Sequence, residues 1–243
     1  MTLSFSVLIM LVAALIYIYD SAVFIYSDEL ILTRDMSGRF SCDFADHRFV
    51  MVGKFLVIQN LMHPHRPAFR VSWANRVTQA DQAGNSKLVR RVSNRLLMLA
   101  PLIWLMAAAL FIVAPFGLFV VHKWLVVGLA LAEYYVGLGL FVTILLLNNK
   151  YLKLKVSEIL AITFESIICP PCGLNIARKI TWRIRLDDDL IFLSRKLMSN
   201  VRHKASLQRL KSRIDLELGD LEQEDPRFLA LSKYNDRVRR ELS

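Results

Sequence analysis

Hydrophobic residues are concentrated in three runs, and the rest of the chain is much more polar. The second run, residues 96–121, has no charged residue, and the third, residues 124–147, has only Glu133. The first run, residues 3–19, is uncharged, and a further apolar segment follows Asp20. A membrane-spanning helix needs about 20 apolar residues. The pattern therefore predicts three transmembrane helices, at 1–27, 96–121 and 124–147.

The first run is interpreted as a retained span rather than a signal peptide. A signal peptide has a basic region before its apolar core and a small-residue cleavage site after it. The first charge of this chain is Asp20, and Tyr17, Tyr19 and Tyr26 are typical of the aromatic belt at a membrane interface. We therefore expect an uncleaved first helix.

The second and third runs are predicted to form a tight hairpin, because only His122 and Lys123 separate them. Pro101 and Pro115 are expected to kink the helix of the second run. Lysine and arginine near span ends stay on the cytoplasmic side. They gather at the open end of the hairpin, as Lys87, Arg90, Arg91, Arg95, Lys150, Lys153 and Lys155. We expect a bacterial inner-membrane protein with its N-terminus outside and its C-terminus in the cytoplasm.

Residues 28–95 are predicted to form a cytoplasmic loop domain. Their apolar stretch, Phe49–Met62, is interrupted by Lys54 and is short for a span. We expect a strand pair or a small buried helix there, with an interfacial segment as the alternative. The segment His63–Pro67, with two prolines, then turns the chain.

Residues 148–186 follow the third run. Apolar side chains recur at helical spacing to Ile167, which predicts that the third helix continues below the bilayer. The segment Cys169–Cys172 should end it, because its two prolines cannot donate helix hydrogen bonds. Residues 174–186 then predict a basic amphipathic helix, which suits either a lipid headgroup surface or docking on the protein's own domain. Its basic and aromatic residues are Arg178, Lys179, Trp182, Arg183 and Arg185.

Residues 187–243 are predicted to form amphipathic helices. Asp187–Asp189 is typical of a helix start, because carboxylates favour the positive end of the helix dipole. A leucine stripe predicts one long helix from there to about Glu224, broken near His203, and Pro226 opens a shorter last helix. Such a stripe must be buried, against its own chain or against another.

The 243 residues carry 31 Lys+Arg against 21 Asp+Glu, a net charge of +10. In a membrane protein such an excess sets topology and attracts anionic lipid. The basic residues between Arg195 and Arg213 alternate with leucines rather than with stacking aromatics, so nucleic acid is not an expected partner. No nucleotide-binding, serine-hydrolase or zinc-peptidase motif is present. We expect no enzyme activity and no cofactor.

Glu133 is the most informative residue of the spans. A charged side chain at the centre of a bilayer costs roughly 2.5–3.5 kcal/mol on insertion scales, so it should face other helices or water. Small residues surround it and let helices approach closely in lipid; they are Ala130 and Gly137 on its own face, and Gly128, Ala132 and Gly139 on the adjacent one. Glu133 is then a proton or cation site, or a protonated carboxyl hydrogen-bonded between helices.

This layout, with Glu133 in the third span, is similar to that of the stator-type proton-channel subunits of energy-transducing complexes. The resemblance implies ion or proton conduction through Glu133. The Gly-Thr-rich second span of that family is missing, since residues 96–121 contain no threonine, and no other residue is carried over.

Cys169 and Cys172 have the C-x-x-C spacing of thiol redox sites and of half a zinc site. With Cys42 they are the three cysteines of the chain, too few for a disulfide scaffold. Zinc would need further ligands, for which the candidates are His63, His65 and His203. Juxtamembrane cysteines can also be acylated, and the remaining alternative is a Pro-Pro turn with two incidental cysteines.

These observations predict a mainly α, polytopic membrane protein. Its leading predicted function is that of a non-enzymatic, oligomeric subunit of a larger inner-membrane complex, in contact with lipid. Its hairpin would pack through small residues, and its cytoplasmic helices would dock further copies or other subunits. The alternatives are an ion or proton channel using Glu133, and a membrane thiol or metal protein using Cys169 and Cys172.

Overall fold

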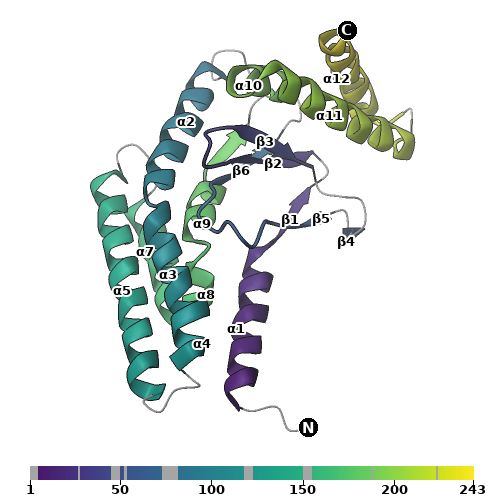
Figure 1. The fold of residues 1–243 in the computed structure, drawn as a ribbon. Helices are drawn as coiled ribbons and strands as arrows, with labels where there is room; N and C mark the ends of the chain where they lie inside the picture. Colours follow the sequence, from purple (N-terminus) through teal and green to yellow (C-terminus); the bar gives the residue numbers. More distant parts are fainter. Residues whose placement is uncertain are drawn as a thin grey trace. The chain divides into compact units, whose positions relative to one another are not determined.

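The computed structural model of the chain describes residues 5–26, 28–44, 50–51, 54–72, 82–117, 123–149, 155–187, 189–222 and 224–243. It is mostly helical, as predicted, and its elements are shown in Figure 1. The chain divides into two compact units. The helical unit comprises Met1–Val23, Ile58–Pro67 and Arg91–Arg183, and the mixed unit comprises Phe24–Val57, Ala68–Arg90 and Ile184–Ser243.

Two helical stretches in the described part of the chain are long and apolar enough to cross a membrane, Ala100–Gly117 and Trp124–Leu147. They lend weak support to membrane association. The first stretch consists of α3 (Ala100–Ala108), the π-helical turn η1 (Ala109–Val113) and α4 (Ala114–Gly117), and it follows α2 (Gln82–Met98). The second lies within α5 (Lys123–Leu147).

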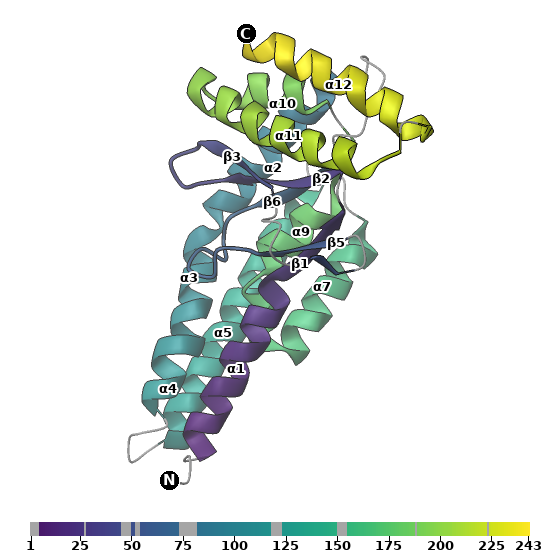
Figure 2. The same ribbon diagram turned by 90° about the vertical axis from the view of Figure 1, so that its right-hand side faces the viewer.

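These two stretches lie side by side and run in opposite directions (Figures 1 and 2). Gly117 of α4 lies against Val126, and Gly137 lies against Met106 of α3. Pro101 is in the first turn of α3, where a missing N–H is tolerated. The wider π-helical turn immediately precedes the turn that contains Pro115, and both features distort regular helices locally.

The first apolar run is shorter as a helix than the predicted span 1–27. Helix α1 (Phe5–Ser21) ends at Ser21, and Ala22–Tyr26 form strand β1. The β-branched and aromatic side chains of this strand favour β structure, and it pairs with β5 (Lys54–Ile58). The apolar part of α1 is below the length of a span, so a third membrane span stays a prediction.

After α5 the chain turns back, and the predicted single helix down to Ile167 does not form. Helix α5 ends at Leu147, where the side-chain amide of Asn148 donates to the carbonyl oxygen of Ile144 (2.8 Å). Helix α7 (Val156–Ile168) then packs along α5. The helices α8 (Pro170–Gly173) and α9 (Ile176–Arg183) follow, so the predicted helix 174–186 is shorter at both ends.

The mixed unit contains a four-stranded sheet in the order β3-β2-β6-β7. Its strands are β2 (Glu29–Arg34), β3 (Phe40–Asp43), β6 (Ala68–Ser72) and β7 (Arg185–Asp187). Strand β2 is antiparallel to both neighbours, and β7 pairs with β6 in parallel. A second sheet has the order β1-β5-β4, in which β4 (Val50–Met51) and β5 form the strand pair expected within Phe49–Met62.

The C-terminal segment forms α10 (Leu190–Leu197), α11 (Asn200–Asp220) and α12 (Pro226–Leu242) instead of one long helix and a short one. Asp189 caps α10 by accepting a hydrogen bond from the backbone N–H of Ile191 (3.1 Å), and the break follows α10 rather than lying near His203. The leucine stripe is mostly buried within this unit, through Leu190, Leu193, Leu197, Leu207, Leu210 and Ile214. The tail therefore covers most of its own apolar face without a second chain.

Candidate functional site

The turn between α7 and α9 carries the two cysteines of the C-x-x-C segment. Cys169 and Cys172 form a disulfide, and both residues are half-buried. Gly173 follows and is buried so closely that a Cβ there would overlap the hydroxyl oxygen of Tyr134 and lie 2.9 Å from Cβ of Ser166. The turn is therefore held against α5 and α7 at a position that suits glycine.

The packing of this turn depends on tyrosines of α5. The hydroxyl of Tyr134 donates to the carbonyl oxygen of Ser166 (2.8 Å), and that of Tyr135 donates to the carbonyl oxygen of Ile167 (3.1 Å). The end of α7 thus lies beside the middle of α5. These bonds satisfy carbonyls in the last turn of α7, which have no partner within their own helix.

The zinc alternative lacks further ligands in the part of the chain that the structure describes. No group of three or more His, Cys, Asp or Glu side chains that could hold a metal ion occurs there. His203 bonds to Ser194 within the mixed unit. Cys42 is buried in the mixed unit, and this burial raises the pKa of its thiol to about 12. The thiol alternative therefore depends on Cys169 and Cys172 alone.

A polar network joins the end of α1 to α7 and α9. The side-chain amide of Asn175 donates to Asp20 Oδ2 (2.8 Å) and to Ser21 Oγ (3.0 Å). The ammonium group of Lys179 pairs with Asp20 (2.8 Å) and with Glu165 (2.7 Å). Partly buried charges are tolerated when they are paired and hydrogen-bonded, and here one cation lies between two carboxylates.

Arg178 lies beside this network and is only 4% exposed. Its guanidinium donates to Asn175 Oδ1 (2.9 Å) and to the carbonyl oxygens of Asn60 (2.5 Å) and His63 (2.9 Å). Burial lowers the pKa of Arg178 to about 10, so it remains charged at neutral pH. Among the described residues no carboxylate contacts this guanidinium. Arg178 is thus a buried cation that ties the loop 58–67 to α9.

Helix α9 is therefore packed within the helical unit along part of its length, and its placement at a lipid surface stays a prediction. Arg178 is buried, Lys179 is ion-paired and Trp182 is half-buried. Arg183 is exposed at the end of α9, and Arg185 belongs to strand β7. The side chains of Arg178 and Lys179 are held by partners from α1, α7 and the loop 58–67.

The loop 58–67 also buries His65, which the sequence suggested as part of a turn and as a candidate zinc ligand. His65 is 1% exposed, and its ring centroid lies 5.5 Å from that of Trp104 and 5.7 Å from that of His63. Burial lowers the pKa of His65 to about 4, and the charges of Arg66 and Arg178 act in the same direction. Both ring nitrogens of His65 lack a hydrogen-bond partner among the described residues. The two histidines and two prolines of this short segment were its only signal in the sequence.

The two small-residue faces of α5 have different surroundings. Ala130 is buried, and Gly137 lies against α3. A Cβ added at Gly128 or Gly139 would meet nothing within 4 Å among the described residues, and Ala132 is exposed. One face is thus used inside the hairpin, and the other is open.

Glu133 is half-buried, next to the packed face of α5. Within the described ranges no side chain forms a hydrogen bond or an ion pair with it. Ion conduction through Glu133 and its protonated, helix-bridging role both stay predictions.

A hydrogen-bonded Ser–His–Glu chain occurs in the mixed unit. Ser194 Oγ lies 2.8 Å from His203 Nδ1, and His203 Nε2 lies 3.5 Å from Glu241 Oε1. The residue types match a hydrolase triad, but Ser194 is fully buried and its hydroxyl lies 2.6 Å from the carbonyl oxygen of Leu190. The chain therefore links α12 to α10 and α11 and does not present a nucleophile to a substrate.

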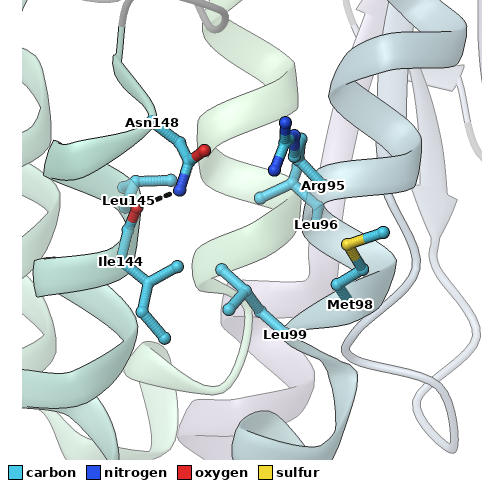
Figure 3. A pocket seen from close by; sticks show the side chains of 7 residues that line it. All are labelled: Arg95, Leu96, Met98, Leu99, Ile144, Leu145 and Asn148. Carbon is cyan, nitrogen blue, oxygen red and sulfur yellow. Dashed lines mark hydrogen bonds between the residues drawn. The ribbon is translucent and has the colours of Figure 1, made fainter.

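A small pocket lies between the junction of α2 and α3 and the end of α5 (Figure 3). It encloses about 50 Å³ and is lined by Arg95, Leu96, Met98, Leu99, Ile144, Leu145 and Asn148. A cavity needs about 10–15 Å³ by this measure to hold one water, so the pocket has room for a few waters or for a group of similar size.

Comparison with known protein families, with curated proteins and with solved structures found no match. No relative therefore supplies a substrate, cofactor or partner. The function has to be inferred from the residues themselves.

Proposed function

We propose that the chain is a non-enzymatic, oligomeric membrane subunit that associates through the open face of α5. The observation that carries this proposal is the exposure of Gly128, Ala132 and Gly139 along one side of an apolar helix. Large apolar side chains flank them, among them Leu129 and Val136, which are 62% and 63% exposed. In lipid, helices associate by close packing at small residues. A second membrane helix, from another copy or another subunit, fits this face.

The proposal includes a bacterial inner-membrane location with the C-terminus in the cytoplasm. It is supported by the basic residues at the open end of the hairpin, set against Lys123 at its turn. Because the leucine stripe of the tail is largely buried within its own unit, the cytoplasmic part would dock partners through its charged surface.

Leucine at the open face should weaken association. In the variant Gly128→Leu/Gly139→Leu, the new Cβ atoms meet nothing within 4 Å among the described residues, but the leucine side chains would prevent close approach of a second helix. We expect association about tenfold weaker, which corresponds to roughly 1.4 kcal/mol. Light scattering and co-purification in mild detergent measure the effect.

The matched control is Leu140→Phe, which adds bulk at another exposed position of α5. It should leave association unchanged. A wild-type protein that is monomeric and co-purifies with no other membrane protein would contradict the proposal.

A second candidate function, a membrane thiol–disulfide carrier, is favoured by the Cys169–Cys172 disulfide. The pair is half-buried and immediately precedes α9. A C-x-x-C disulfide can be redox-active, and this pair would exchange electrons with a partner dithiol. A partner dithiol would attack one sulfur as thiolate and then close its own disulfide. Two electrons and two protons would thereby pass to Cys169 and Cys172.

A redox titration tests this second function. Across glutathione buffers of graded potential, we expect Cys169 and Cys172 to convert between disulfide and dithiol within the cytosolic range, about −220 to −320 mV. Alkylation followed by mass spectrometry measures the dithiol fraction. Cys42 is the internal control, because its buried thiol, with a pKa raised to about 12, should stay unlabelled in the folded protein. A pair that stays bonded, or stays reduced, at every potential in this range contradicts the carrier function.

A further inference from the structure

Four basic side chains gather where the loop 58–67 meets α9. His65 and Arg178 are buried and form the inner side of this basic cluster, and His63 and Arg66 are half-buried and form its open side. The backbone of the cluster is well fixed, because the carbonyl oxygen of His63 accepts from Arg178 (2.9 Å) and from the N–H of Arg66 (3.2 Å).

The cluster has polar nitrogens that nothing in the described chain satisfies. They are Nδ1 of His63, both ring nitrogens of His65, Nε of Arg66 and Nε of Arg178. Buried polar groups in native proteins are nearly always hydrogen-bonded, and an exception calls for an explanation such as an ion. With its pKa lowered to about 4, His65 is neutral at neutral pH, so only one of its two ring nitrogens carries a hydrogen. That N–H and the Nε–H groups of Arg66 and Arg178 are three unpartnered donors in one cluster, which indicates a missing acceptor.

The cluster also has an excess of positive charge. The neighbouring carboxylates, Asp20 and Glu165, are both paired with Lys179. In the described ranges no ion pair joins a carboxylate to Arg66 or Arg178. A buried cation is stabilised by a counter-ion in contact with it, so the missing acceptor should be an anion.

We infer that the basic cluster of His63, His65, Arg66 and Arg178 binds a phosphate group, either of an anionic phospholipid or of free phosphate. A phosphate offers several acceptor oxygens to convergent donors, and guanidinium groups match its geometry. Arg66 and His63 would contact it from the open side, and His65 and Arg178 would contact it from below. This site is independent of the open face of α5 and of the cysteine pair.

The test uses the full chain, in detergent for native mass spectrometry and in nanodiscs for unfolding. One arm compares the retention of phosphatidylglycerol with that of phosphatidylcholine. The other arm follows the thermal unfolding midpoint with added inorganic phosphate at constant ionic strength. The variants are Arg66→Gln and His63→Gln, whose side chains do not hold the loop in place. Arg183→Gln is the matched control, because it removes the same charge from the exposed end of α9.

If the ligand is the lipid headgroup, the wild type and Arg183→Gln should hold phosphatidylglycerol about tenfold more tightly than Arg66→Gln or His63→Gln does. If the ligand is free phosphate, inorganic phosphate should raise the thermal unfolding midpoint of the wild type and of Arg183→Gln, but not that of Arg66→Gln or His63→Gln. Equal behaviour of the wild type, Arg66→Gln and His63→Gln in both arms overturns the inference.

Discussion

Replacing Gly173 with alanine is expected to destabilise the helical unit by about 2–3 kcal/mol. The new Cβ would overlap the hydroxyl oxygen of Tyr134 and lie 2.9 Å from Cβ of Ser166. Alanine also restricts the unfolded chain, which stabilises the folded protein by only about 0.4–1 kcal/mol. The overlap is the larger effect, so the net change should be a loss of stability. Chemical denaturation in detergent, followed by tryptophan fluorescence, measures the change.

A double variant separates this overlap from a general effect of alanine. Tyr134→Phe removes the overlapping hydroxyl and its bond to Ser166, which costs about 1 kcal/mol alone. In the presence of Gly173→Ala it should restore part of the lost stability, although the ring carbon would still lie 3.2 Å from the new Cβ. Gly219→Ala, where a Cβ meets nothing within 4 Å, is the control and should be neutral or stabilising. Equal stabilities of Gly173→Ala and the wild type would show that the turn moves freely.

Replacing Arg178 with methionine is expected to destabilise the helical unit by about 3 kcal/mol. Methionine keeps much of the side-chain volume but leaves the amide oxygen of Asn175 without the donor that Arg178 supplies. The carbonyl oxygens of Asn60 and His63 each lose one of their two donors and keep a backbone N–H, that of His63 and that of Arg66 respectively. Each buried acceptor that loses its donor costs about 1–3 kcal/mol. Methionine also removes the desolvation cost of the buried guanidinium, and this gain offsets part of the loss.

Arg178→Met should destabilise the loop 58–67 more than the rest of the helical unit. Hydrogen exchange at the backbone of residues 58–67 is expected to rise first, because Arg178 supplies two of the bonds that hold this loop. Arg178→Lys keeps the charge but has no fork of donors, so it should be intermediate. If Arg178→Met left both stability and exchange unchanged, the buried cation would contribute nothing to the fold of the loop.

Local sequence signals determined much of the secondary structure. Uninterrupted apolar runs were sufficient for the two long helices of the hairpin, since helix formation there depends only on neighbouring residues. The start of α10 at Asp189 and of α12 at Pro226 also followed from capping and proline geometry. The apolar stretch Phe49–Met62 left a strand pair and a small buried helix open, and the structure shows the strand pair β4–β5.

Signals that depend on distant partners were not readable in the sequence. The apolar periodicity that ends at Ile167 was equally compatible with a straight continuation of α5 and with a helix packed against it. Strand β7 was assigned to a helix because β6, its partner, lies more than a hundred residues earlier. For the basic helix the sequence left a lipid surface and docking on the protein's own domain equally open, because Asp20, Asn60 and His63 are remote in the chain.

The sequence by itself therefore determined that this chain has an apolar helical hairpin, with Glu133 among small residues and a C-x-x-C turn. The tertiary structure decided which small residues pack inside the hairpin and which stay open, because that depends on the rotation of α5 against α3. It also decided that Arg178 is a buried cation and that His65 has unpartnered nitrogens. Hydrophobic runs act through adjacent residues, whereas burial and hydrogen bonding depend on which distant segments come together.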